Sequence, residues 1–234
     1  MKEPWGIPPR ANAEFVWRME DALAAYTRPY DPRFPQVCLD ELSLQLLADS
    51  RPPLPARPGA PAKEDYEYVR RGTANCFMLF EPLRGRREVL VTARRTKTDW
   101  AQCIRTLLDV CYPQAERVVL VQDNLNTHSP ASLYEAFPPA AAKRLADRLA
   151  IHPTPKHGSW LTMAEIELSV LERQCLHRRL PDLDTAAAEV AGWVARRNAA
   201  AVTVDWRCTT ADARIKLTHL YPVLQPITSA VTAH

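Results

Sequence analysis

Acidic side chains follow two short apolar segments of this sequence. Asp123 follows the run from Val118 to Val121 with only Gln122 in between, and Asp40 and Glu41 come directly after Val37 to Leu39. Ligands gather at the carboxyl ends of strands in open α/β sheets, and Mg²⁺ prefers oxygen ligands such as carboxylates. Asp40 and Asp123 are therefore candidate metal ligands, although a strand-end aspartate more often only caps the following turn.

Phosphoryl transfer with two metal ions would need a third acid. Two Mg²⁺ ions about 3.5–4 Å apart repel each other unless anionic oxygens from several elements surround them. The segment from Trp160 to Leu176 offers Glu165, Glu167 and Glu172. At about 100° per residue, Glu165 and Glu167 lie on opposite flanks of the apolar stripe of a helix, so periodicity does not decide between them.

The strands that would position these acids are short. Val118 to Val121 are apolar without alternation and three of them are β-branched, which predicts a central parallel strand buried on both faces. Residues 37–39 predict a second short strand that runs out into acids. Residues 66–80 and 88–92 predict an antiparallel pair joined by a basic turn, and residues 150–152 a brief strand.

Apolar residues at intervals of three and four predict the helices. They are expected over residues 11–26, 98–112, 130–137, 140–149, 160–176, 185–198 and 211–220. Thr98 is the expected N-cap of the second helix, and Thr209 with Asp212 forms a capping-box pattern at the start of the last one. The proline-rich stretch 50–62 is expected to be an exposed loop.

Composition indicates a globular cytoplasmic protein. The chain has 234 residues, is 47% hydrophobic and 24% charged, and has no apolar run near the ~18 residues of a membrane span. Residues 1–10 lack the apolar core of a signal peptide. The six cysteines contain no C-x-x-C pair, so reduced, buried thiols are expected. A net charge of +3 is compatible with a polyanionic partner but does not establish one.

Three segments together resemble the catalytic motifs of bacterial insertion-sequence transposases of the mariner superfamily, a DDE group. They are V-C-L-D-E (37–41), V-Q-D-N-L-N-T-H (121–128) and K-H-G-S-W-L-T-M-A-E-I-E-L-S-V-L-E-R-Q-C-L (156–176). The resemblance covers roughly residues 1 to 222, and includes E-Y-V-R-R-G-T-A-N (67–75) and D-A-R-I-K-L (212–217). It implies an α/β fold of the RNase H-like class, with a mixed five-stranded sheet flanked by helices and a helical C-terminal extension.

The resemblance assigns catalysis and metal binding to Asp40, Asp123 and Glu165. Glu165 is preferred because L-T-M-A-E matches the family's pattern, with Thr162 in place of the usual Asn, and Glu167 stays the alternative third ligand. The implied cofactor is a pair of Mg²⁺ or Mn²⁺ ions, and the implied activity is DNA strand cleavage and strand transfer in transposition. Two alternatives stay open: a nuclease of the same fold without strand transfer, and an inactive remnant that only binds DNA or a full-length transposase.

The implied partners are the ends of the mobile element and the target DNA, bound by a homodimer. Family members normally begin with a DNA-reading helix-turn-helix region, and the segment before Val37 is too short for one. Two alternatives follow: the chain is one product of a split gene, with a separate helix-turn-helix half, or it is a truncated remnant. The expected divisions are an N-terminal helix and linker (1–35), the catalytic domain (36–180) and the C-terminal extension (181–234).

Several basic side chains are expected to contact DNA phosphates. For the arginines of the hairpin turn, exposure to solvent without a DNA contact is an equally open alternative. For the histidines, the equally open alternative is that they hydrogen-bond to loop carbonyls. The residues are Arg84, Arg86, Arg87, Arg94, Arg95, Lys97, His128, Lys156 and His157.

Overall fold

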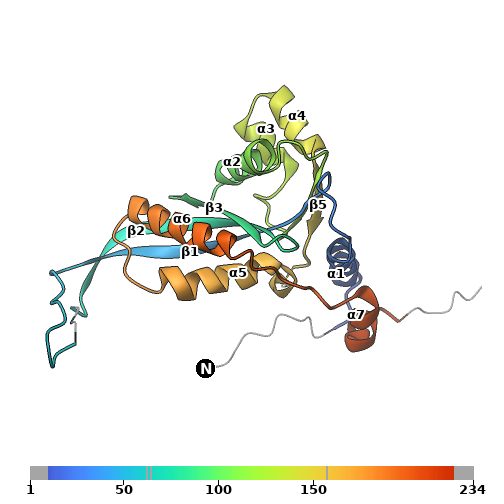
Figure 1. Cartoon of the computed structure of the whole chain (residues 1–234). Helices are drawn as coiled ribbons and strands as arrows, with labels where there is room; N and C mark the ends of the chain where they lie inside the picture. The colour runs from blue at the N-terminus through green and yellow to red at the C-terminus, as the bar shows by residue number, and fades with distance from the viewer. Residues whose placement is uncertain (1–9, 62, 64, 157, 224–234) are drawn as a thin grey trace, which may run out of the picture.

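The computed structural model describes residues 10–61, 63, 65–156 and 158–223, so the expected site residue His157 lies outside the described residues. Seven α-helices, five strands and four short 3₁₀ or π segments follow one another in this part of the chain (Figure 1). In order they are α1 (Ala13–Tyr26), β1 (Gln36–Asp49), β2 (Tyr68–Glu81), β3 (Arg86–Thr92), α2 (Lys97–Thr106), η1 (Leu107–Cys111), β4 (Val118–Gln122), α3 (Pro130–Ala136), α4 (Pro139–Asp147), β5 (Leu149–Pro153), η2 (Ser159–Leu161), α5 (Met163–Leu171), η3 (Glu172–Leu176), α6 (Leu183–Ala199), α7 (Thr210–Lys216) and η4 (Thr218–Leu220).

The five strands form one mixed sheet in the order β3-β2-β1-β4-β5. β1 pairs antiparallel with β2 and β2 antiparallel with β3, whereas β1, β4 and β5 run parallel. Every residue of β4 is buried, because the strand lies between two others and is covered on both faces. The expected central parallel strand and the expected antiparallel pair are both confirmed.

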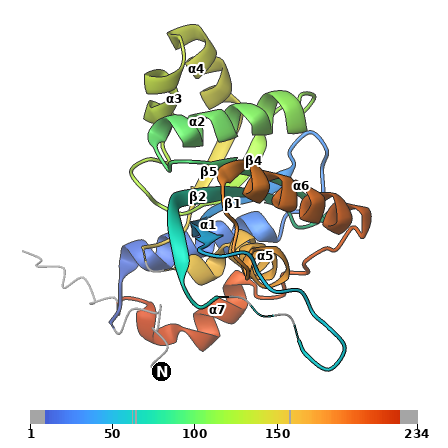
Figure 2. The same cartoon turned by 90° about the vertical axis from the view of Figure 1, so that its left-hand side faces the viewer.

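Helices cover both faces of the sheet. The cluster on one face contains Cys38, Met78 and Val121 from the strands and buried residues of α1, α5 and α6. The cluster on the other face contains Leu39, Phe77 and Leu120 together with buried residues of α2, η1, α3 and α4. Figure 2 shows this layering, with α2, α3 and α4 on one side of the strands and α1 and α5 on the other. Successive residues of a strand therefore face different helices.

The first strand is longer than its sequence suggested. β1 does not end at the acids but continues to Asp49, and Asp40 lies opposite Met78 within the ladder with β2. The expectation of a strand over 37–39 was wrong in this respect. Leu42, Leu44 and Leu46 face the core while Ser43 and Gln45 are exposed, so beyond the acids the strand alternates as one that is covered on a single face.

Most helix boundaries follow the expected pattern. α2 begins one residue earlier than expected, because Thr96 and not Thr98 is its N-cap and forms a capping box with Asp99. Thr209 and Asp212 form the capping box expected for α7. The proline-rich stretch is irregular apart from isolated bridges between Leu54 and Lys63 and between Arg57 and Ala60, and it extends beyond the far ends of β1 and β2 (Figure 1).

α6, in the segment expected as a C-terminal extension, is part of the main core. Ala186, Val190 and Trp193 are buried in the same cluster as β1 and β2. Five of the cysteines are buried and free, as expected, and Cys208 is half-buried. Within the described residues, no helix combines the length and the apolar character that crossing a membrane requires.

The turn between β2 and β3 packs against the chain that follows α6. Arg87 N donates a hydrogen bond to Asn198 Oδ1 at 2.8 Å, and Asn198 Nδ2 donates to the carbonyl of Arg87 at 2.8 Å. Gly85 has φ +62°, and a Cβ at this position would lie 2.6 Å from the carbonyl oxygen of Val202. The turn thus needs glycine both for its backbone conformation and for its close approach to the C-terminal segment.

Gly85→Ala is expected to lower the free energy of unfolding by about 2 kcal/mol or more, because a left-handed alanine costs roughly 1–2 kcal/mol and the backbone at Val202 must also shift. Gly59→Ala is the matched control, since Gly59 has φ +80° but open space around it. The control should lose only the conformational part, about 1 kcal/mol. Urea denaturation measures both, and equal losses would contradict the close packing of the turn.

Candidate active site

Asp40 and Asp123 are brought together by the pairing of β1 with β4. Leu39 is in register with Gln122 in this parallel pair, so that the two aspartates are the next residues along their strands. Asp40 is half-buried, and the backbone N–H of Glu41 donates to its Oδ1 at 2.8 Å. The structure therefore places these two acids side by side at the point where β4 ends.

Glu165 approaches the same place from the helical layer. It lies in the first turn of α5, whose residues Met163 and Ala164 pack in one cluster with Cys38, two residues before Asp40. Burial raises the pKa of Asp40 to about 7, and the negative charges of Asp123, Glu41 and Glu165 add to the rise. The negative charges of the other two acids of the expected triad thus disfavour ionisation of Asp40.

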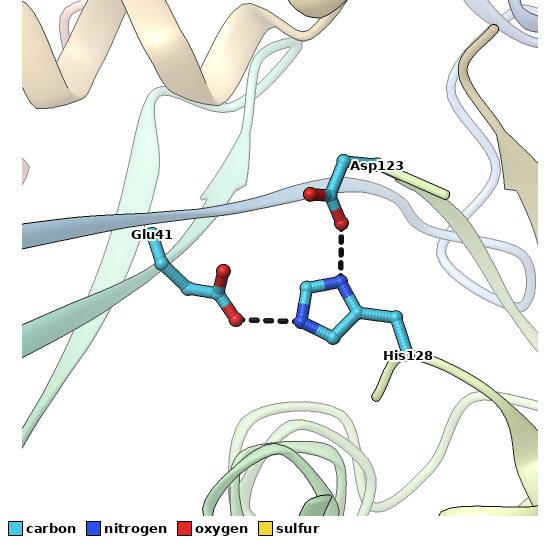
Figure 3. A group of neighbouring side chains, drawn as sticks. All are labelled: Glu41, Asp123 and His128. Atoms are coloured by element: carbon cyan, nitrogen blue, oxygen red, sulfur yellow. Dashed lines mark hydrogen bonds and ion pairs between the residues drawn. The ribbon is translucent and has the colours of Figure 1, made fainter. Parts of the chain in front are cut away.

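His128 connects Asp123 to a further acid, Glu41 (Figure 3). Its Nε2 lies 2.6 Å from Glu41 Oε1, and its Nδ1 makes a short hydrogen bond with Asp123 Oδ1. The imidazole stacks on Trp100 with ring centroids 5.9 Å apart. Burial lowers the pKa of His128, but its hydrogen bonds with Asp123 and Glu41 outweigh this and raise it to about 9. His128 is therefore an imidazolium at neutral pH.

This arrangement corrects the expectation for His128. The side chain neither faces phosphate nor bonds to a loop carbonyl, because both ring nitrogens are used by carboxylates. The sequence analysis assigned no role to Glu41. Because side chains alternate along a strand, Glu41 lies on the face of the sheet opposite Asp40, the face that α2 and Trp100 cover. The sequence offered a spacing of five residues from Asp123 to His128, but nothing that connected His128 with Glu41.

Glu167 has a different environment from Glu165. Its Oε2 accepts a hydrogen bond from Arg87 Nε at 2.7 Å and one from Arg197 Nε at 3.2 Å, and its Oε1 accepts one from Arg197 Nη2 at 2.9 Å. Burial raises the pKa of Glu167, but the two guanidinium groups outweigh it and hold the pKa below its usual value. Both oxygens of Glu167 are thus occupied by arginines, whereas Glu165 is exposed and its charge contributes to the raised pKa of Asp40.

Two arginines of the expected basic tip face protein. Arg87 is completely buried in its ion pair with Glu167, which corrects its expected role as a phosphate contact to a structural one. Arg86 donates to the carbonyl of Cys111 at 3.3 Å and lies over the ring of Tyr112. Arg84 is the only one of the three with an exposed side chain. Since Phe80 pairs with Cys38, the tip also extends away from Asp40, toward the start of β1.

The remaining basic residues of the expected set lie closer to the carboxyl ends of the strands. Arg94 and Arg95 are exposed in the link from β3 to α2, and Lys97 forms an ion pair with Glu135 at 2.6 Å. Lys156 lines a hollow of 510 Å³ that also involves Asp123, Asn124, Thr154 and Gly158. Lys156, one of the expected DNA contacts, thus lines the same cavity as the candidate metal ligand Asp123.

The donor set is suited to a hard divalent cation. Asp40, Asp123 and Glu165 supply only oxygen atoms, which Mg²⁺ and Mn²⁺ prefer. Burial is the main cause of the raised pKa of Asp40, and the negative charges of Asp123, Glu41 and Glu165 add to it, so a nearby cation would favour the ionised carboxylate. Among the described residues, the acids and histidines whose ligand atoms all lie within 4.8 Å of one another are Glu41, Asp123 and His128, a group that does not include Asp40 or Glu165. Binding a metal through His128 would break one of its hydrogen bonds.

Thr162 begins α5 without using its side chain. It is the N-cap residue, but its hydroxyl makes no capping hydrogen bond, and its Oγ1 is buried without a partner among the described residues. The turn is closed instead by the backbone hydrogen bond from Glu165 N to the carbonyl of Thr162 at 3.1 Å.

Residues 35–186 match the family described as DDE superfamily endonuclease. The chain belongs to this family. The DDE endonuclease fold also agrees with solved structures of the mariner transposase Mos1. Its paired-end complex with Mg has a TM-score of 0.55 at 16% identity, covering 95% of this chain and 68% of the Mos1 chain. The isolated catalytic domain of Mos1 has a TM-score of 0.50 at 13% identity, and the match covers 85% of this chain and 96% of that domain.

The described chain is shorter than the Mos1 chains in most of these complexes. In the paired-end complex with Mn, the TM-score is 0.53 at 16% identity, and the match covers 86% of this chain but 62% of the Mos1 chain. No curated protein sequence matches. The mixed five-stranded sheet flanked by helices is the RNase H-like fold of the Mos1 catalytic domain, as expected.

Glu167→Gln is expected to lower the free energy of unfolding by about 3–5 kcal/mol, because it leaves the buried guanidinium of Arg87 without its anion. Glu165→Gln is the matched control on the same helix. Glu165 is exposed, so its substitution should change stability by no more than about 0.5 kcal/mol. Chemical denaturation of both variants tests this division of roles, and a larger loss for Glu165→Gln would reverse it.

His128→Ala is expected to destabilise the protein by about 2–4 kcal/mol, since the Glu41 carboxylate, 2% exposed, loses its cation. In a Glu41→Gln background, the same substitution should cost at least about 1 kcal/mol less, because the two groups are coupled. A double-mutant cycle measured by denaturation gives this coupling. Strict additivity would show that the Glu41 and His128 contact contributes nothing.

Proposed function

We propose that this DDE endonuclease is the catalytic part of a transposase that cleaves DNA and transfers the cut strand to a target. Asp40, Asp123 and Glu165 are proposed to hold two Mg²⁺ or Mn²⁺ ions. The observation that carries the proposal is the environment of Asp40, a half-buried carboxyl whose pKa is raised to about 7 by burial and by the charges of Asp123, Glu41 and Glu165. Such a concentration of anionic oxygens at a strand end is suited to metal-dependent phosphoryl transfer.

The residues of the chain would divide the work. When bound, the ions would supply the positive charge that activates the attacking hydroxyl or water and stabilises the departing oxygen. The strand pairing fixes Asp40 and Asp123, and His128 holds the Asp123 carboxylate in one orientation through its short hydrogen bond. The hollow lined by Asp123, Thr154 and Lys156 would receive the DNA backbone beside the acids. The phosphoryl group would pass directly between oxygens of DNA or water, with no covalent enzyme intermediate.

DNA is the proposed partner, as element ends and as target, with a homodimer acting on both ends. The Mos1 structures are paired-end and strand-transfer complexes, which supports this choice of substrate. Base-specific reading is proposed to come from a separate helix-turn-helix half. Arg214, on α7, is engaged with Glu20 through two hydrogen bonds of 2.8 Å, so its guanidinium already has a partner within the chain.

A nicking assay on supercoiled DNA tests the reaction. Nicking should require Mg²⁺ or Mn²⁺, and Asp40→Asn, Asp123→Asn or Glu165→Gln should each lower its rate at least about a hundredfold, since lost ion binding removes several kcal/mol of transition-state stabilisation. Glu172→Gln, an exposed glutamate just after α5, is the control and should keep the wild-type rate. Unchanged nicking in the three variants would disprove the assignment.

Strand transfer is tested separately with a precut element end and a target plasmid. Joined product identifies a transposase, whereas nicking without joining identifies a nuclease of the same fold. DNA binding without either reaction, in Mg²⁺ and in Mn²⁺, would identify a remnant without catalytic function.

A further inference from the structure

A basic groove runs along the outside of α6 and η3, away from the acids of the active site. Two adjoining hollows of 320 and 310 Å³ share Gln174 and Arg196. The η3–α6 groove is formed by the residues that line them: Arg173, Gln174, Cys175, His177, Arg178, Glu189, Trp193, Arg196, Arg197 and Ala200. Four of these are arginines and one is an acid.

The charges in the groove are only partly neutralised. Arg178 forms an ion pair with Glu189, and Arg197 is held by Glu167 at 2.9 Å. Arg173 and Arg196 are exposed and have no acidic partner among the described residues. The groove therefore carries two cations that the protein itself does not neutralise, within a hollow that is otherwise polar.

Specific contacts give the groove a defined shape. Trp193 Nε1 donates to Gln174 Oε1 at 2.9 Å, which fixes the amide and leaves its N–H₂ group as a donor. Arg196 Nη1 lies 3.5 Å from where a Cβ of Gly192 would be, so the guanidinium is laid back along α6. η3 is a π-helical segment, a local widening that is frequent at functional sites. Arginine forks and an oriented amide are suited to phosphate oxygens.

The groove lies farther along the helical segment that carries Glu165, but on another side of it. α5 with η3 and α6 run antiparallel, since Arg197 contacts Glu167 whereas Trp193 contacts Gln174 (Figure 1). Gln174 is nine residues beyond Glu165, which corresponds to roughly 13 Å along the axis at about 1.5 Å per residue and to about half a turn around it at about 100° per residue.

We propose that the η3–α6 groove binds the phosphate backbone of duplex DNA. Arg173 and Arg196 each neutralise one phosphate, and Gln174 donates a hydrogen bond to the same strand. The binding of DNA by the groove does not depend on the proposed function. Such contacts position the duplex and carry no sequence information directly.

The test measures the affinity of a fluorescent duplex against salt, without divalent metal so that binding is separated from cleavage. Each neutralised phosphate contributes about 0.9 to the log–log slope, so Arg173→Ala with Arg196→Ala should flatten the slope by about 1.8. The Arg173→Lys and Arg196→Lys pair should keep a nearly wild-type slope, because the charges remain. Arg105→Ala with Arg117→Ala, exposed arginines outside the groove, removes the same charge and should leave the slope unchanged.

An unchanged slope in the variant that combines Arg173→Ala with Arg196→Ala, or an equal change in the Arg105 and Arg117 control, overturns the groove proposal. If the slope changes as expected but the wild-type protein cuts no DNA in Mg²⁺ or Mn²⁺, the groove stands and the proposed function fails.

Discussion

The site depends on the register of one parallel strand pair. Because Leu39 is opposite Gln122, the following residues Asp40 and Asp123 are forced to the same position at the end of β4. Two carboxylates held this close raise the free energy of the folded state unless cations compensate them. The imidazolium of His128 supplies part of the compensating positive charge. It hydrogen-bonds to Asp123 and Glu41 and stacks on Trp100. The remainder would come from the divalent cations that we propose Asp40, Asp123 and Glu165 to bind.

Features that arise from neighbouring residues could be predicted from the sequence. The run of β-branched residues in β4, the apolar stripe of α1 and the capping box of α7 were all evident, since strand burial, helical periodicity and capping are encoded over a few residues. The extent of β1 was not, because Asp40 and Glu41 read as the end of a strand. They are tolerated inside it because each is stabilised by groups from other elements or faces the site.

The same distinction separates the parts of the site that were predicted from those that were not. The order of Asp40, Asp123 and Glu165 was suggested by their motifs, and in the structure the charges of Asp123 and Glu165 contribute to the raised pKa of Asp40. The structure adds that Glu167 is engaged by Arg87 and Arg197, which lie 80 and 30 residues away from it in the sequence. Arg87 looked like a surface cation in a basic turn, because a sequence shows a charge but not a partner so distant.

The turn at Gly85 and its partners beyond α6 affect how the chain can fold while it is being made. The hydrogen bonds between Arg87 and Asn198 can form only after Asn198 is synthesised, 111 residues later. At about 5–20 residues per second this delay lasts roughly 5 to 20 s. Throughout it, β3 has no neighbour on its outer side and is not yet covered by α6. Until α6 is made, the apolar side chains of β2 and β3 that it covers in the folded protein stay exposed, and such surface makes nascent chains prone to aggregate.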